Sequence, residues 1–333
     1  MSIETYPTIA LVADGLTSSS LVFDGRIIPV GPCDYRWRLA FARPDYLLVE
    51  SAWSGLRDRW KYKIAAYPGH PERTNRALVR LVQAAKDRGI PTVFWNKEDS
   101  VHFERFVASA KLFDHVFTVD ANAVQRYKAV MGENASVHTL MFAIQPRTHG
   151  FTGFNFKHRR ANFVGSYSSE NHVRRRAWQD TLFGAACRSG LGLTVVDRNS
   201  GRKASHYRFP ALDGLDVRHA LRHEQTAQMY RDYVVSLNVN TVEDSPTMFS
   251  RRLVEILGCG GIAVTTPAMS VDAMFADFCH VVRNDDEARE LFARLRNGPS
   301  DRDLERARAG AEHVAAHHTW QHRLQQIAEV LER

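Results

Sequence analysis

Short apolar runs alternate with amphipathic stretches along the first half of the chain. The runs end in polar residues, as buried strands of a parallel sheet do, and they cover residues 8–15 (TIALVADG), 46–51 (YLLVES), 91–99 (PTVFWNKED), 115–120 (HVFTVD) and 136–143 (SVHTLMFA). Between the second and third runs, apolar residues recur at helical spacing from Ala77 to Ala85, with Thr74 as a cap and Gly89 as a stop. The pattern predicts a doubly wound parallel sheet of about six strands.

A second series of strands and helices follows an irregular segment. Residues 145–160 show no steady period and contain Pro146, Gly150 and Gly153, as a connection between domains does. Further predicted strands lie at 161–166 (ANFVGS), 191–198 (LGLTVVDR), 215–221 (LDVRHAL), 234–240 (VVSLNVN) and 261–266 (GIAVTT), and three helices are expected after Asp286. The predicted domains are residues 1–150, residues 151–315, and a closing helix over 316–333 that packs back on the first domain.

Composition narrows the class of protein. The 333 residues are 44% hydrophobic and 24% charged, which is typical of globular chains, and no apolar run is long enough to span a membrane. Because the N-terminus also lacks a secretory pattern, a cytoplasmic protein is expected. The four cysteines have no C-x-x-C spacing, so they predict free thiols and no zinc site.

The net charge of +7 is compatible with three kinds of partner: nucleic acid, an anionic membrane surface or a phosphorylated small ligand. Basic residues cluster in KHRR (157–160) and HVRRR (172–176), but no long basic run is present, which disfavours nucleic acid. Motifs of serine hydrolases, P-loop kinases and zinc proteases are absent, and Asp301–Asp303 is interpreted as a helix cap.

Residues 238–266 (NVNTVEDSPTMFSRRLVEILGCGGIAVTT) predict an anion site beyond the end of a strand. A helix that begins near Thr247–Ser250 would present free backbone N–H groups to a diphosphate. Arg251 and Arg252 would add guanidinium groups, and Glu255 would accept from ribose hydroxyls. The alternative is a surface ion pair of Arg251 with Glu255, one helical turn apart.

The phrases DSPTMFSRR, VEILGCGG, ESAW, FWNKED and HHTWQHRL resemble the CgeB-type (spore-maturation-like) glycosyltransferases within the group 1 GT-B enzymes. The resemblance spans nearly the whole chain. It implies an α/β GT-B fold with two Rossmann-like domains facing across a cleft, a nucleotide-sugar held by the C-terminal domain and an acceptor held by the N-terminal one. Related enzymes carry two glutamates eight positions apart; Glu255 matches the second, and Thr247 replaces the first.

The resemblance and the loop chemistry together give the candidate site residues. The donor-binding candidates are Gly165, Ser166, Arg174, Thr247, Met248, Phe249, Ser250, Arg251, Arg252 and Glu255. The acceptor-side candidates, at the ends of N-terminal strands, are Glu50, Trp53 and Asn96. Arg174 is alternatively part of a solvated basic helix face, and Trp53 a buried loop anchor.

Ionisable residues gather in FWNKEDSVHF (94–103), which ends another predicted strand. A transferase needs a group that removes the proton of the acceptor hydroxyl, and Asp99 or Glu98 is the first candidate, with His102 the second. The alternative is that Asp99 or Ser100 caps a helix over VHFERFVASAK.

Three functions remain open from the sequence. The first is sugar transfer from a nucleoside-diphosphate sugar to an acceptor hydroxyl, without metal or other cofactor, in which arginine and helix-end amides stabilise the departing diphosphate. The second is a sugar-nucleotide epimerase, and the third is a non-catalytic glycan- or nucleic-acid-binding module. The expected partners are the nucleotide-sugar, an unknown acceptor, and an anionic membrane or membrane-bound glycan precursor.

Overall fold

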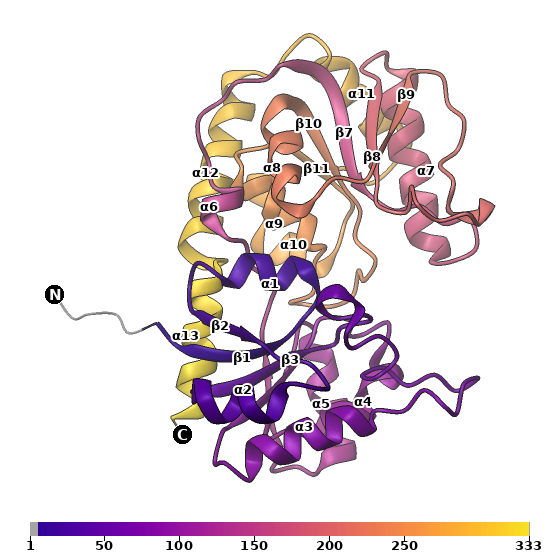
Figure 1. The fold of residues 1–333 in the computed structure, drawn as a ribbon. Coiled ribbons are helices and arrows are strands. Elements are labelled where there is room, and N and C mark those ends of the chain that lie inside the picture. Colours follow the sequence, from indigo (N-terminus) through magenta and orange to yellow (C-terminus); the bar gives the residue numbers. More distant parts are fainter. Residues whose placement is uncertain (1–5, 333) are drawn as a thin grey trace, which may run out of the picture. The chain divides into compact units, whose positions relative to one another are not determined.

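The computed structural model describes residues 6–332, and these residues form two compact units (Figure 1). Unit 1 comprises the described part of residues 1–142, the short segment Pro246–Met248 and the described residues from Trp320 onward. Unit 2 comprises Ala143–Ser245 and Phe249–Thr319. Each unit is built around its own parallel sheet.

The sheet of unit 1, within residues 6–332, has six parallel strands in the order β2, β1, β3, β4, β5, β6. The strands are β1 (Thr8–Val12), β2 (Arg26–Pro29), β3 (Tyr46–Glu50), β4 (Thr92–Asn96), β5 (His115–Thr118) and β6 (Ser136–Thr139). The three central strands β3, β4 and β1 are almost entirely buried, which is why they read as continuous apolar runs in the sequence.

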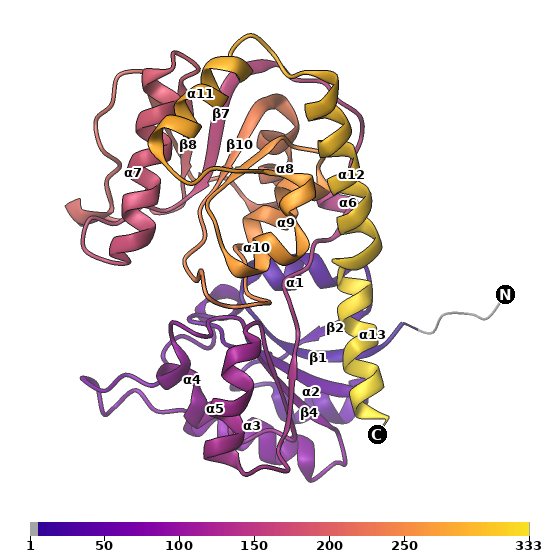
Figure 2. The same cartoon turned by 180° about the vertical axis from the view of Figure 1, so that it is seen from behind.

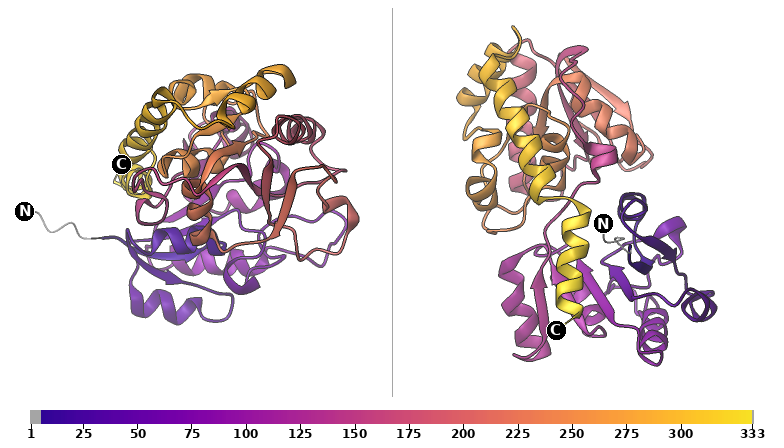
Figure 3. Two further views of the ribbon diagram at one scale, coloured as in Figure 1. Left: turned by 90° about the horizontal axis from the view of Figure 1, so that it is seen from above. Right: turned by 90° about the vertical axis from the view of Figure 1, so that its left-hand side faces the viewer.

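Helices cover both faces of this sheet. The unit contains α1 (Gly15–Leu21), α2 (Tyr35–Ala42), η1 (Leu56–Asp58), α3 (Arg76–Lys86), α4 (Phe103–Ala110), α5 (Ala121–Met131) and α13 (Trp320–Leu331). Alternate strand residues such as Val49 and Phe94 share a core with α2, α3, α4 and α5. Trp95 points to the other face and meets Trp320 of α13, with ring centroids 5.3 Å apart, and Figure 3 shows α13 lying across the strands.

Unit 2 repeats this architecture with strand order β12, β11, β10, β7, β8, β9, all pairs parallel, in the part of the chain that the structure describes. The strands are β7 (His158–Gly165), β8 (Leu193–Asp197), β9 (Leu215–His219), β10 (Tyr233–Asn238), β11 (Ala263–Thr265) and β12 (His280–Val281). The helices are α6 (Pro146–His149), α7 (Val173–Arg188), η2 (Ser205–Tyr207), α8 (His223–Asp232), α9 (Arg251–Gly258), α10 (Met269–Met274), η3 (Ala276–Phe278), α11 (Asp285–Leu295) and α12 (Asp301–His317). Helices α7 and α11 pack side by side on one face, as Figure 2 shows.

The predicted α/β fold class with two Rossmann-like sheets is confirmed, with differences at the ends of elements. The sequence pattern missed β2, a partly exposed edge strand that ends in Pro29, and the two-residue β12. Strand β7 starts at His158, whereas the sequence predicted a start at Ala161. The first residues of the strand project beyond the buried part of the sheet, so they carry no hydrophobic signal. Helix α4 begins at Phe103 with His102 as its N-cap, so neither Asp99 nor Ser100 caps it.

All four cysteines lie among the described residues and are free thiols, as predicted. In residues 6–332 no helix is long and apolar enough to cross a membrane.

Candidate functional site

Three arginines of unit 2 converge on the end of β7 and the turn that follows it. Arg252, in the first turn of α9, donates from Nε to the carbonyl oxygen of Val164 at 2.5 Å. Arg175 on α7 donates to the carbonyl oxygen of Ser166 at 3.4 Å, and Arg198, just after β8, donates to the Ser166 Oγ at 3.3 Å. The three guanidinium groups therefore meet at the carboxyl edge of the sheet, where parallel α/β sheets bind ligands.

The three arginines of the cluster carry like charges and repel one another. Burial, and then the repulsion of Arg252 and Arg198, lowers the pKa of Arg175 to about 9. The pKa of Arg252 is likewise lowered, by burial first and by Arg198 in addition. Among the described residues the Arg175 Nε is buried without a hydrogen-bond partner. An anion at this point would relieve the repulsion and bind the unused donor.

Gly165 and Ser166, both predicted donor-binding residues, lie at the centre of this arginine cluster (Arg175, Arg198 and Arg252). A Cβ atom on Gly165 would stand 2.6 Å from an Arg252 terminal nitrogen, so only glycine lets that side chain lie over the strand end. Ser250 is the N-cap of α9, as the predicted helix start requires, and its own N–H donates to Asn240 at 3.1 Å. The N-terminus of α9, where the positive end of the helix dipole lies, is therefore at Ser250.

Four other predicted donor residues have different surroundings. Arg174 is 81% exposed and pairs with Glu243, so it faces away from the cluster that its neighbour Arg175 joins. The Thr247 Oγ1 donates to Val119 and accepts from the Ala121 N–H within unit 1, each at 2.9 Å. Half-buried Met248 belongs to the same short segment of unit 1, whereas Phe249 is buried in unit 2.

Phe249 is part of the core of unit 2, because its ring packs edge-on against Phe275 with centroids 4.9 Å apart. We therefore leave Thr247, Phe249 and Arg174 out of the donor site proposed below.

Glu255 is buried in a network of polar groups from three helices. Its Oε1 accepts from the Arg251 Nε at 3.1 Å and lies 3.8 Å from the His223 Nε2, and its Oε2 accepts from Tyr230 at 3.4 Å. Burial would raise the pKa of Glu255, but the basic groups around it, His149 and Arg251 first, outweigh burial and lower the pKa. The ion pair of Arg251 with Glu255 is thus present, and it is more enclosed than a surface pair.

Unit 1 contains a buried ion cluster at the ends of β1, β3 and β4. The Lys97 Nζ lies 2.9 Å from a Glu50 carboxylate oxygen and 3.2 Å from an Asp14 oxygen. Glu50 also accepts from the Thr17 hydroxyl at 2.6 Å. Burial alone would lower the pKa of Lys97, but Glu50 and Asp14 outweigh it and raise the pKa. Glu50, predicted on the acceptor side, is completely buried and holds this cluster together.

A second buried network surrounds Asp99, the first candidate for the catalytic base. Asp99 accepts from Asn96 at 2.8 Å, from Thr118 at 2.8 Å and from Tyr127 at 3.0 Å, and its side chain has no solvent exposure. Burial is the main cause that raises the pKa of Asp99 to about 7, and Asp120 adds to it. An acceptor hydroxyl cannot reach a carboxylate enclosed in this way. The placement argues against Asp99 as the base and gives Asn96 the role of a buried partner.

The other predicted residues of unit 1 lie closer to the surface. Glu98 and His102 are partly buried, and burial lowers the pKa of His102, with Arg105 adding to the effect. The half-buried Trp53 packs edge-on against His102 with ring centroids 5.2 Å apart. Glu98 and His102 therefore remain the candidates for proton removal, and Trp53 the candidate for contact with an acceptor.

Comparison with known families decides the class of this protein. The model of the family described as glycosyl transferase-like matches residues 155–329, which is more than half of the chain. The chain belongs to the glycosyl transferase-like family. It is a glycosyltransferase, as the sequence predicted, and the matched range contains Gly165, Ser166 and the three arginines of the cluster. No match was found among curated proteins.

Solved structures show that this glycosyltransferase has the GT-B fold. It is similar to Anabaena HepE in complex with UDP, with 14% identity, a TM-score of 0.56, and coverage of 98% of this chain and 91% of that one. For the UDP-forming trehalose-phosphate synthase of Burkholderia xenovorans, the values are 12% identity, a TM-score of 0.53 and coverage of 89% and 76%. A Listeria monocytogenes protein, described as a putative UDP-N-acetylglucosamine 2-epimerase, has 10% identity and a TM-score of 0.54, with coverage of 98% of this chain and 96% of that one.

One group of side chains in the glycosyltransferase has the composition of a metal site. Among residues 6–332, His149, His223 and Glu255 form a set whose ligand atoms all lie within 4.8 Å of one another. Burial lowers the pKa of His149 to about 4; Glu255 opposes this shift, and His223, Arg251 and Arg231 add to it. A cation placed here would face those guanidinium groups, one of which already binds Glu255. We assign no metal to this set.

The sequence interpretation did not include two residues of the arginine cluster, Arg175 and Arg198. Arg175 lies on the buried face of α7, four positions before buried Gln179 and seven before buried Leu182, so helical periodicity would have separated it from Arg174. Arg198 is the last residue of the predicted strand 191–198 and directly follows β8, which is a position where parallel sheets place ligand-binding side chains. Asp14 lies near the end of the first predicted apolar run, and its pairing with Lys97, 83 positions away, has no local signal.

The buried Asp99 carboxyl predicts a pH-dependent stability. In the folded protein it keeps its proton up to about pH 7, whereas in the unfolded chain it loses the proton near its ordinary pKa of 3.8. The folded state binds more protons between these values, so the free energy of unfolding should fall as pH rises from 4 to 7, by up to about 4 kcal/mol. Urea unfolding of wild type and D99N at several pH values measures the effect. In D99N the free energy of unfolding should not show this fall with pH. The control D301N, at an exposed position, should show the same fall as wild type. An equal fall in D99N and wild type would refute the assignment.

Proposed function

We propose that this glycosyltransferase takes its sugar from a nucleoside-diphosphate sugar whose diphosphate binds to Arg175, Arg198 and Arg252. The observation that carries the proposal is the convergence of the three guanidinium groups on Gly165 and Ser166, with an unused buried donor on Arg175. A diphosphate has the charge and the acceptor oxygens that such a cluster binds. The first turn of α9 adds N–H groups and the positive end of a helix dipole.

The same cluster supports transfer without a metal ion. When the bond between the sugar and the diphosphate breaks, negative charge grows on the leaving diphosphate. Guanidinium groups already fixed around it stabilise that charge with little reorganisation. In this proposal Arg252 has the largest share, because it is held between the carbonyl oxygen of Val164 and the ring of Phe163.

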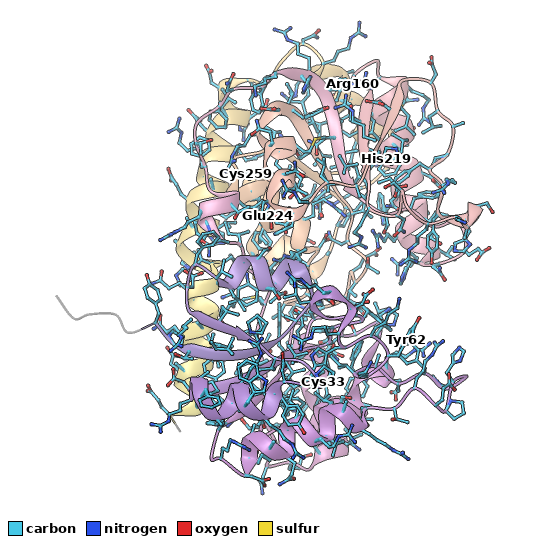
Figure 4. The ribbon with its side chains drawn as sticks, viewed as in Figure 1. Cys33, Tyr62, Arg160, His219, Glu224 and Cys259 are labelled. Carbon is cyan, nitrogen blue, oxygen red and sulfur yellow. The ribbon has the colours of Figure 1, made fainter. Side chains whose placement is uncertain are left out.

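The nucleoside is proposed to lie between the end of β9 and the start of α8. Figure 4 shows His219 at the end of β9 and Glu224 in the first turn of α8. Glu255 keeps its predicted role toward the ribose, which rests on the resemblance to group 1 enzymes. HepE was solved with UDP, and this supports UDP as the first nucleotide to test.

The narrower CgeB-type membership is part of the proposal, as are an acceptor held by unit 1 and a cytoplasmic location. Glu98 or His102 would take the proton of the acceptor hydroxyl. A fold likeness of 10% identity to a putative epimerase does not by itself separate sugar transfer from epimerisation. Product analysis with donor alone separates them, since an epimerase converts the donor without an acceptor.

A thermal-shift screen with UDP, GDP, CDP and dTDP tests the donor site. One nucleotide should raise the unfolding temperature by a few degrees, since a ligand that binds only the folded state stabilises it. R175Q should lose the shift, and R174Q, one position away on the exposed face of the same helix, should keep it. If no nucleotide shifts the wild-type protein, or if R175Q responds like wild type, the proposed site is wrong.

A further inference from the structure

Helix α2 of unit 1 exposes an apolar stripe to solvent. Phe41 is 83% exposed and Trp37, one turn earlier, is 52% exposed. Exposed Ala40 lies between them in sequence, and exposed Cys33 comes just before the helix (Figure 4). The spacing of three and four residues places these side chains along one side of the helix. Large aromatic side chains that are exposed in such a row mark a binding surface.

The opposite side of α2 fixes the direction of this stripe. Tyr35 and Leu39 are buried and belong to the core that covers the sheet of unit 1. Helix α3 packs beside α2 on the same face, and its Leu78, Leu81 and Val82 enter the same core (Figure 1). Because both helices turn their buried sides to the sheet, their exposed sides form one outer face, which we call the α2–α3 face.

The α2–α3 face is basic. Helix α2 contains Arg36 and Arg38, helix α3 contains Arg76, Arg80 and Lys86, and neither helix contains an Asp or Glu residue. Arg38 pairs with Asp34 and Lys86 with Asp114.

Other cations of this face have no such partner. Arg36, Arg76, Arg80 and Arg43, which ends α2, form no ion pair with any residue from 6 to 332. Val79, which is 41% exposed, adds an apolar side chain between Arg76 and Arg80.

We propose that the α2–α3 face docks the enzyme on an anionic lipid bilayer. Tryptophan and phenylalanine insert at the level of the lipid headgroups, and basic residues beside them attract anionic lipids. Each Arg or Lys close to such a surface adds a similar increment of binding, so four unpaired arginines and two aromatic rings are effective together. The proposal goes beyond the donor site, and it does not depend on that site.

Charge distinguishes the bilayer from a second copy of the chain. A two-fold symmetric dimer places the same surface against itself, so the unpaired arginines of one α2–α3 face would meet those of the other, and neither helix supplies an Asp or Glu to pair with them. An anionic bilayer supplies both the negative charge and the apolar layer that the face requires.

Co-sedimentation of the full chain with lipid vesicles tests the docking. The protein should sediment with vesicles of phosphatidylcholine and phosphatidylglycerol in about a 7:3 ratio, much less with phosphatidylcholine alone, and less as NaCl rises from about 50 mM to about 500 mM. W37S/F41S should lower the partition coefficient at least about tenfold. R76Q/R80Q should lower it several-fold and weaken its dependence on salt.

Matched controls keep the test falsifiable. V173S removes an exposed valine of α7 and R302Q an exposed charge of α12, both in unit 2, and both should bind like wild type. Unfolding temperature and circular dichroism show that each variant is folded.

Three results would overturn the proposal. The first is no binding of wild type to either vesicle, and the second is binding that neither double variant changes. The third is a protein that does not bind vesicles but forms a dimer in light scattering, or that binds an acidic polypeptide such as polyglutamate through this face. In those last cases a second copy or an acidic protein would be the partner.

Discussion

R252M is expected to lower kcat/KM for the sugar donor about 100-fold, because it removes a fixed charge from the point where the diphosphate departs. The side chain is held by Val164 and Phe163, so its guanidinium group needs no reorganisation when negative charge develops. An interaction that strengthens in the transition state raises kcat, so the loss should fall mainly on kcat. Release of nucleoside diphosphate from the donor, followed by an enzyme-coupled assay, measures it.

R174Q is the control for this experiment. Arg174 also lies in unit 2 and also carries a positive charge, but it is exposed and paired with Glu243. Its variant should keep kcat/KM within about threefold of wild type. A folded R252M protein that keeps its activity within tenfold of wild type would remove Arg252 from the site, and an equal loss in R174Q would indicate a general effect of net charge.

K97M is expected to lower the free energy of unfolding by about 3–5 kcal/mol, since it leaves the Glu50 carboxylate buried without its cation. The Glu50 side chain is 1% exposed and the Lys97 side chain 14%, so solvent cannot replace the lost partner. Asp14 would lose the same cation, and it joins β1 to the loop after β3 through the N–H groups of Ser54 and Gly55. Urea unfolding followed by circular dichroism measures the change.

A second substitution tests the cause of that loss. K97M/E50Q removes both charges of the pair, so it should be more stable than K97M alone. K111M removes an exposed lysine after α4 and should change stability by no more than about 0.5 kcal/mol. If the free energy of unfolding of K97M lies within about 1 kcal/mol of the wild-type value, the cluster contributes little to stability.

The sequence determined the strands of both sheets apart from β2 and β12, and most of the helices. Buried central strands such as β3 and β4 are continuous apolar runs, and helices such as α3 repeat their apolar residues at helical spacing, so burial is visible locally. The start of α9 at Ser250 and Arg251 followed from its polar loop and the glycines after the helix. Elements without a buried side, such as β2, gave no such signal.

The sequence also pointed to the strand ends at which the proposed donor site lies, but not to all of its side chains. Arg252 was predicted from the chemistry of its loop and Gly165 and Ser166 from the family resemblance, and all three lie in the arginine cluster. Which of two neighbouring arginines joins them depends on the rotation of α7, which packing against the sheet decides. Arg175 joins the cluster and Arg174 does not.

Tertiary structure alone decided which polar residues are buried together. Lys97 meets Glu50 and Asp14, which are 47 and 83 positions away, because the carboxyl ends of parallel strands lie at one edge of a sheet whatever their separation in the chain. Asp99 was a plausible base by its chemistry, and only its contacts with Thr118 and Tyr127 show that it is enclosed. Local patterns record whether a position is buried against its own sheet, whereas the partner of a buried charge is fixed by strand order and by the packing of side chains from distant segments.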